Sequence, residues 1–86
     1  MMYYVYLLQS LNKEFSYIGS TPDLRKRVKK HNQGKVKSTK PYIPLKLIYY
    51  EAYLNEKDAI DREKRLKQRG SSKGHLIKRL KYSFSD

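Results

Sequence analysis

The chain has 86 residues, a length that accommodates one small domain with a modest core. Its 20 Lys and Arg residues outnumber 8 Asp and Glu residues, and the net charge of +12 indicates a polyanionic partner, most commonly nucleic acid. Cysteine is absent, which excludes disulfides and thiolate metal sites. The apolar run at residues 1–8 is too short for a membrane span and lacks the basic start of a signal peptide, so we expect a cytoplasmic protein.

Two aromatic strands are predicted at the start of the chain. Residues 3–8 are aromatic and aliphatic without interruption, and residues 14–19 repeat that character after a polar segment, which is typical of a hairpin. Tyr6 and Tyr17 share one face of this hairpin if the loop between them has an even number of residues. Tyrosine is also a common strand residue, so either side chain alone is equally consistent with simple packing.

A first helix is predicted to follow the hairpin. Thr21 is a plausible N-cap, Pro22 suits the first helical position, and Gly34 is a natural stop. At about 100° per residue, Leu24 and Val28 define the buried stripe of this helix. The helix therefore packs one apolar side onto the hairpin.

Arg27 and His31 lie four residues apart, at the side of this helix that is turned toward the hairpin. Each also has a structural interpretation, because an arginine can pack its stem on the core and a histidine can be a hydrogen-bonded boundary residue. The other basic residues of this region are predicted to contact the phosphates of a nucleic acid: Arg25, Lys26, Lys29, Lys30, Lys35, Lys37 and Lys40.

The second half of the chain is predicted to contain one strand and two helices. Residues 45–50 are apolar enough for a central strand, and a helix over 56–69 begins at the cap Asn55. A short third helix around 76–80 precedes residues 82–86, which we expect to be a disordered tail. The predicted fold is α/β of the α+β type, with a three-stranded, mainly antiparallel sheet flanked by three helices in the order β-β-α-β-α-α.

Glu63 lies in the middle of the apolar stripe of the 56–69 helix. A carboxylate in such a place loses hydration and needs a cation, a metal ion or good hydrogen-bond donors. Two interpretations follow, namely a metal ligand and a structural ion pair with Arg27 across the core.

Two triplets and the helix after them resemble the GIY-YIG nucleases, a superfamily that includes homing endonucleases, an incising subunit of bacterial excision repair and short stand-alone bacterial proteins. The first triplet is matched by Tyr4-Val5-Tyr6 and the second by Tyr17-Ile18-Gly19. Arg27 corresponds to the family's helix arginine, and His31 stands where the family carries histidine or tyrosine. The ordered set is a more specific signal than either triplet alone.

Glu63 matches the metal-binding glutamate of the family, so the resemblance extends over residues 4–67 of a single domain at 1–86. Tyr4 departs from the pattern, because the family usually has glycine there. The asparagine that many members place after the glutamate helix has no clear counterpart among residues 70–86, and the short stand-alone branch has the same feature.

The resemblance implies an endonuclease that hydrolyses DNA phosphodiester bonds with one divalent metal ion, Mg²⁺ or alternatively Mn²⁺. In this interpretation Glu63 holds the metal ion and Arg27 clamps the scissile phosphate. Tyr6 would activate the attacking water and Tyr17 would orient the phosphate, with the reverse assignment as the alternative. A phenol needs its pKa lowered to act as a base, and His31 would serve as the relay or as the base itself.

The expected substrate is DNA rather than RNA, in structured or single-stranded form, during repair or recombination at the nucleoid. We expect a monomer, with a dimer as the alternative, and a protein partner that supplies specificity. Two other functions are consistent with the charge: a catalytically weak or inactive nucleic-acid-binding module with the same fold, and a basic structural or ribosome-associated protein.

Overall fold

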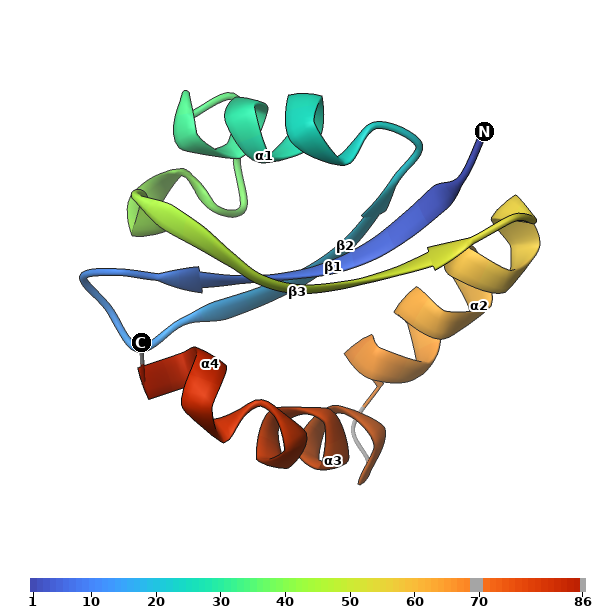
Figure 1. The fold of residues 1–86 in the computed structure, drawn as a ribbon. Helices are drawn as coiled ribbons and strands as arrows, with labels where there is room; N and C mark the ends of the chain where they lie inside the picture. Colours follow the sequence, from blue (N-terminus) through green and yellow to red (C-terminus); the bar gives the residue numbers. More distant parts are fainter. Residues whose placement is uncertain (69–70, 86) are drawn as a thin grey trace.

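The structure is a computed structural model that describes residues 1–68 and 71–85 (Figure 1). Within these residues three strands form one sheet: β1 (Tyr3–Ser10), β2 (Ser16–Thr21) and β3 (Leu45–Tyr53). The same residues contain four α-helices and one 3-10 helix: α1 (Leu24–Asn32), η1 (Lys40–Tyr42), α2 (Glu56–Lys67), α3 (Ser71–Arg79) and α4 (Lys81–Ser85). No described helix has the length and apolar character needed to cross a lipid bilayer.

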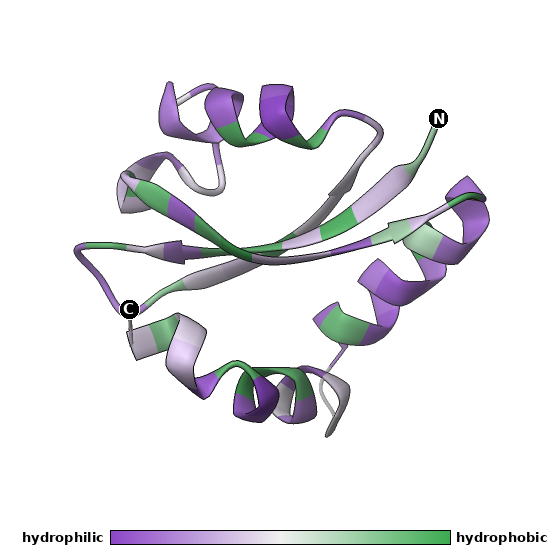
Figure 2. Cartoon of the chain, viewed as in Figure 1, coloured by the Kyte–Doolittle hydropathy of each residue, from purple (hydrophilic) through white to green (hydrophobic). Residues whose placement is uncertain are grey.

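The sheet lies between two layers of helices. α1 covers one face, and α2, α3 and α4 cover the other (Figure 1). The apolar segments of α1 are turned toward the sheet and its hydrophilic segments point away from it (Figure 2). Both pairings in the sheet are antiparallel, so the predicted α+β class is confirmed.

The hairpin of β1 and β2 determines where the two motif tyrosines point. The backbone N–H of Ser10 donates to the carbonyl of Phe15 at 2.9 Å, which leaves four residues, 11–14, in the loop. Tyr6 is opposite Gly19 and Tyr17 is opposite Leu8. Partners across a sheet share a face and residues two apart share it too, so both tyrosines face α1, as the even loop predicts.

β1, and not β3, is the central strand. The order is β2-β1-β3, so the prediction of a central strand at residues 45–50 is wrong. The apolar run misleads because helices cover both faces of the sheet, and an edge strand then also buries side chains on both sides. Leu47 packs in the cluster on the α1 side, and Ile48 and Tyr49 pack on the α2 side.

The start of α1 also differs from the prediction. The N-cap is Asp23, whose carboxylate accepts from the backbone N–H of Lys26 at 3.1 Å. Thr21 ends β2, and its hydroxyl accepts from the backbone N–H of Asp23 at 3.1 Å. The predicted stop at Gly34 is confirmed by its φ of 73°, a conformation that suits glycine. The cap at Asn55 is confirmed as well.

The end of the chain is helical where the sequence predicts disorder at 82–86. Residues 81–85 form α4, a fourth α-helix beyond the predicted three; residue 86 is outside the described part. Phe84 is half-buried and packs against the apolar cluster on the α2 side of the sheet. Its backbone N–H donates to the carbonyl of Leu80 at 3.0 Å. The packing of Phe84 therefore holds α4 against the sheet, although the other residues of this segment are mostly polar.

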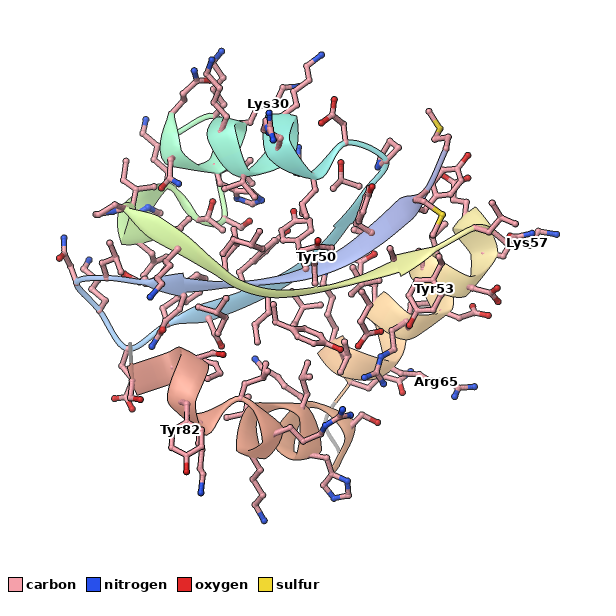
Figure 3. All side chains as sticks on the ribbon, in the orientation of Figure 1. Lys30, Tyr50, Tyr53, Lys57, Arg65 and Tyr82 are labelled. Carbon is pink, nitrogen blue, oxygen red and sulfur yellow. The ribbon has the colours of Figure 1, made fainter. Side chains whose placement is uncertain are left out.

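A carboxylate network joins β3 to α2, and no pattern in the sequence predicts it. Glu51 accepts from Nε and Nη2 of Arg62 at 2.9 and 3.0 Å and from the Tyr49 hydroxyl at 2.7 Å. The Tyr53 hydroxyl, on the α2 side of the sheet in Figure 3, donates to the same carboxylate. Burial raises the pKa of Glu51, but the hydrogen bonds from Arg62, Tyr53 and Tyr49 outweigh it, so the pKa lies below its ordinary value.

The variant Glu51→Gln is expected to lower the free energy of unfolding by about 1 to 3 kcal/mol at pH 7, because Arg62 loses its charged partner. The Glu51 charge makes its full contribution to the free energy of unfolding above pH ~4.3, the ordinary carboxyl pKa of the unfolded chain. This contribution disappears as the pH falls through the pKa of Glu51 in the folded protein, which is lower. Urea unfolding of both proteins at pH 7 and pH 3 measures this. Equal stability of the two proteins at pH 7 would contradict the role given to the network.

Candidate active site

A buried chain of hydrogen bonds links β1 to α1. The hydroxyl of Tyr6 lies 2.8 Å from Nε2 of His31, and Nδ1 of His31 lies 2.8 Å from the hydroxyl of Thr39. Thr39 in turn donates to the carbonyl of Val36 at 3.4 Å, so its oxygen accepts from Nδ1–H. Nε2 is then the acceptor for the Tyr6 hydroxyl. All three side chains are at most 1% exposed.

Burial keeps both titrating groups of this hydrogen-bonded chain, His31 and Tyr6, neutral at neutral pH. Burial lowers the pKa of His31 to about 4, and the charge of Arg27 contributes in the same direction. Burial raises the pKa of the Tyr6 hydroxyl; Arg27 opposes this increase, while the negative charge of Glu63 adds to it. The sequence suggested a lowered pKa for the phenol, but burial outweighs Arg27. At neutral pH Tyr6 is therefore a proton donor to a neutral imidazole.

Tyr17 completes the aromatic group on this face of the sheet. Its ring centroid lies 5.1 Å from the His31 ring and 6.4 Å from the Tyr6 ring. Tyr17 is half-buried, in contrast to Tyr6. Of the two motif tyrosines, Tyr17 is therefore the one with more contact with solvent.

Gly19 is required by the position of the Tyr6 ring. A Cβ atom at residue 19 would lie 2.5 Å from Cζ of Tyr6 and 3.0 Å from Cε2 of Tyr17, which is closer than side chains pack. The last position of the second triplet therefore has no room for a side chain. This is the physical reason for glycine in Tyr17-Ile18-Gly19.

Arg27 lies at an open basic cavity of about 280 Å³ beside the N-terminal part of α1. Lys26 and Lys30 also line this cavity, together with Asp23. Arg27 is half-buried, whereas both lysines are exposed. The cavity thus offers one half-buried guanidinium and two exposed ammonium groups to an anion.

Glu63 reaches the site from α2, on the other side of the edge strand β2. Its carboxylate accepts from the Ser20 hydroxyl at 2.7 Å and pairs with Nζ of Lys67 at 2.8 Å. In the described part of the chain its ion pair is with Lys67, so the interpretation as a pair with Arg27 is wrong. Nζ of Lys67 also lies 5.5 Å from the centroid of the Tyr17 ring. Lys67 thereby connects Glu63 with the aromatic group.

The pattern of the GIY-YIG catalytic domain matches residues 2–76. This chain belongs to the GIY-YIG family. A UPF0213 protein of Pediococcus pentosaceus is 39% identical over 86 residues, 98% of this chain and 90% of that protein. A UPF0213 protein of Streptococcus pneumoniae is 37% identical over 67 residues, 77% of this chain and 67% of the relative. The solution NMR structure of a UPF0213 protein of Bacillus halodurans has a TM-score of 0.56 and 32% identity, and the match covers 94% of this chain and 86% of that one.

Glu63 of this GIY-YIG domain fits a single-carboxylate metal site. No group of three or more His, Asp and Glu residues gathers anywhere in the described residues. A lone carboxylate suits a hard cation such as Mg²⁺, which keeps several of its own waters. Burial raises the pKa of Glu63, but the bonds from Lys67 and Ser20 lower it more, so the carboxylate is charged at neutral pH.

The predicted phosphate contacts of the GIY-YIG domain lie on its surface. All seven are exposed along α1, the segment after it and the start of η1: Arg25, Lys26, Lys29, Lys30, Lys35, Lys37 and Lys40. Lys30 lies on α1 in Figure 3, where it is exposed. These residues form a basic surface next to Arg27, and their contact with a nucleic acid stays a prediction.

Sequence reasoning missed three residues that hold the GIY-YIG site together: Ser20, Thr39 and Lys67. Ser20 directly follows the second triplet, and Lys67 is one helical turn after Glu63, so spacing offered a signal for both. Thr39 lies in a loop eight residues after His31, where no periodicity applies.

Two alanine substitutions test the packing of the GIY-YIG motif. Gly19→Ala is expected to lower the free energy of unfolding by about 1 to 3 kcal/mol, because the new methyl group meets the rings of Tyr6 and Tyr17. Gly74→Ala is the matched control, since nothing lies within 4 Å of its Cβ position in α3. It is expected to raise the stability by about 0.5 to 1 kcal/mol. Thermal or urea unfolding measures both; equal effects of the two substitutions would contradict the close contact at Gly19.

Proposed function

We propose that this GIY-YIG protein is an endonuclease that hydrolyses phosphodiester bonds in DNA with one divalent metal ion, Mg²⁺ or alternatively Mn²⁺. The observation that carries the proposal is the hydrogen-bonded pair of Tyr6 and neutral His31, with Arg27 close enough to influence the pKa of both. A phenol with a proton acceptor behind it and a guanidinium beside it can move a proton and hold a phosphate.

Arg27 binds the scissile phosphate in this mechanism. Its planar fork can donate two parallel hydrogen bonds to phosphate oxygens, which a lysine cannot do. The cavity that it lines is open and basic, so a phosphate can enter from solvent. Tyr17, half-buried beside the Tyr6 ring, donates a further hydrogen bond that orients the phosphate.

Tyr6 handles the attacking water, which would reach its hydroxyl past the half-buried side chains of Tyr17 and Arg27, because Tyr6 itself is 1% exposed. The water oxygen forms a bond to phosphorus, the bond from phosphorus to the leaving oxygen breaks, and the leaving oxygen takes a proton from solvent. The proton of the water passes to Tyr6 while the hydroxyl proton of Tyr6 passes to Nε2 of His31. A phosphate at Arg27 offsets the positive charge that helps to lower the pKa of His31, so the substrate itself makes the imidazole a better acceptor.

Glu63 is the residue that would hold the divalent cation, whose charge would stabilise the developing negative charge on the leaving oxygen. Ser20 fixes one carboxylate oxygen at 2.7 Å, so the carboxylate is oriented before any cation binds. Lys67 pairs with the other oxygen through a flexible side chain that can move aside. The divalent cation would thus take the place of the Lys67 ammonium group beside the Glu63 carboxylate, which is already charged.

The substrate class follows from the surface. The basic residues of α1 and of the segment after it attract the phosphate backbone without reading sequence. We therefore assign specificity to the shape of structured or single-stranded DNA or to a protein partner, in repair or recombination at the nucleoid. The proposed enzyme acts in the cytoplasm as a monomer, with a dimer as the alternative for cutting both strands.

The proposal is tested by cleavage of labelled single-stranded, duplex and branched DNA with Mg²⁺ or EDTA. Cleavage is expected with Mg²⁺ alone, and Glu63→Gln is expected to reduce it by roughly 100-fold or more, the scale of losing one positioned charge in an active site. Glu56→Gln, in the first turn of the same helix, is the control and should cleave like the wild type. Salt-dependent binding without cleavage in any condition would instead indicate a nucleic-acid-binding module.

The same assay separates the two tyrosines. Under single-turnover conditions Tyr6→Phe should lose more activity than Tyr17→Phe, because only Tyr6 contacts Nε2 of His31. Unchanged cleavage by Tyr6→Phe together with lost cleavage by Tyr17→Phe would reverse the two roles.

A further inference from the structure

We propose that a second cavity, next to the candidate active site, binds one unpaired nucleobase of the DNA strand. This inference rests on the proposed function for the identity of the nucleic acid. The cavity has a volume of about 550 Å³, which is within the range of about 300 to 1,000 Å³ of small-ligand sites. Its walls are aromatic, aliphatic and basic: Tyr4, Tyr50, Leu24, Val28, Leu47 and Arg25.

The two tyrosines form an aromatic platform. The ring centroids of Tyr4 and Tyr50 lie 5.9 Å apart with the planes at 68°, so the rings meet edge to face. Tyr50 is 53% exposed. In Figure 3 it lies on the side of the sheet that carries α1. A flat base can stack on one ring while the other ring borders its edge, and stacking on tyrosine is a common way to hold single-stranded nucleic acid.

The charges at the cavity favour a base over a phosphate. Arg25 is exposed and can stack on a base or contact the phosphate next to it. Asp23 lines both cavities, but here a single cation, Arg25, balances its carboxylate, whereas Lys26, Arg27 and Lys30 surround the other cavity, so a phosphate is favoured there. The aliphatic residues Leu24, Val28 and Leu47 suit the apolar faces of a base. The phosphate would thus bind in the cavity of Arg27, and the base in the cavity of Tyr4 and Tyr50.

The sheet places this cavity directly beside the catalytic group. Tyr50 is the partner of Tyr6 in the pairing of β1 with β3, and Tyr4 lies two residues before Tyr6 on the same face. The cavity also shares Pro22 and Asp23 with the basic cavity of Arg27. A strand whose phosphate lies at Arg27 can therefore place a neighbouring base between the two tyrosines.

Tyr4, the residue at which this chain departs from the GIY-YIG motif, has a role in this cavity. Tyr4 stands where the family usually has glycine, and glycine has no ring to offer to the cavity. In a duplex the bases are paired and stacked, so they cannot enter without being flipped out. The cavity therefore selects single-stranded DNA or unpaired nucleotides in structured DNA.

The experiment measures binding by the full chain in EDTA, so that it does not depend on cleavage. Fluorescence anisotropy gives the dissociation constants for a labelled single strand and for its duplex. Tyr50→Leu is expected to weaken single-strand binding by roughly 5- to 100-fold, the scale of losing one stacked base, and to leave duplex binding unchanged. Tyr50→Phe keeps the ring and should bind like the wild type. Tyr82→Leu is the matched control, because Tyr82 is 72% exposed on α4, on the opposite side of the sheet (Figure 3).

A second readout uses a single strand that carries 2-aminopurine. Its fluorescence should fall when the wild-type protein or Tyr50→Phe binds, because the base stacks on the ring, and should fall less with Tyr50→Leu. Equal loss of single-strand and duplex binding in Tyr50→Leu, or no loss in either, would overturn the proposal. The nuclease proposal is tested separately by Glu63→Gln with Mg²⁺, so a failure of one is distinguishable from a failure of the other.

Discussion

The hydrogen bond between Tyr6 and His31 is the interaction on which the rest of the structure depends. It joins the central strand to α1 through side chains that are at most 1% exposed, and Thr39 completes it from the segment beyond the helix. A buried polar group without a partner is costly, so this chain of bonds fixes how α1 lies on the sheet. It also requires glycine at residue 19, since a side chain there would push the Tyr6 ring away from His31.

The candidate site is built around the edge strand β2, with contributions from both faces of the sheet. Tyr17 lies on the α1 face, and Ser20 lies on the opposite face, where it orients Glu63 of α2. Lys67 spans the two sides, because it pairs with Glu63 and lies near the Tyr17 ring. Packing of α2 against the sheet therefore brings an acid and a cation from one helix next to a phenol that lies far earlier in the sequence. Neither layer alone carries the complete set.

The alternation and periodicity of apolar residues along the sequence were enough to predict much of the fold. Alternation along a hairpin with an even loop placed Tyr6 and Tyr17 on one face, and the pairing confirms it. Features that depend on tertiary contact were not predictable in this way. Thr39 lies in a loop, the contact of Lys67 with the Tyr17 ring exists only once α2 is docked against β2, and Phe84 anchors a polar segment that composition alone describes as disordered. Periodicity identifies the buried side of an element but not the neighbour that meets it.

The most direct test of this account is an NMR titration of the imidazole nitrogens of His31, because it reads the proton chain without requiring any activity. We predict that Nδ1 carries the proton at neutral pH, that Nε2 accepts from Tyr6, and that the pKa is about 4. Tyr6→Phe should shift the Nε2 resonance, since it removes the donor. A proton on Nε2, or a pKa near the ordinary histidine value of ~6.5, would contradict the account.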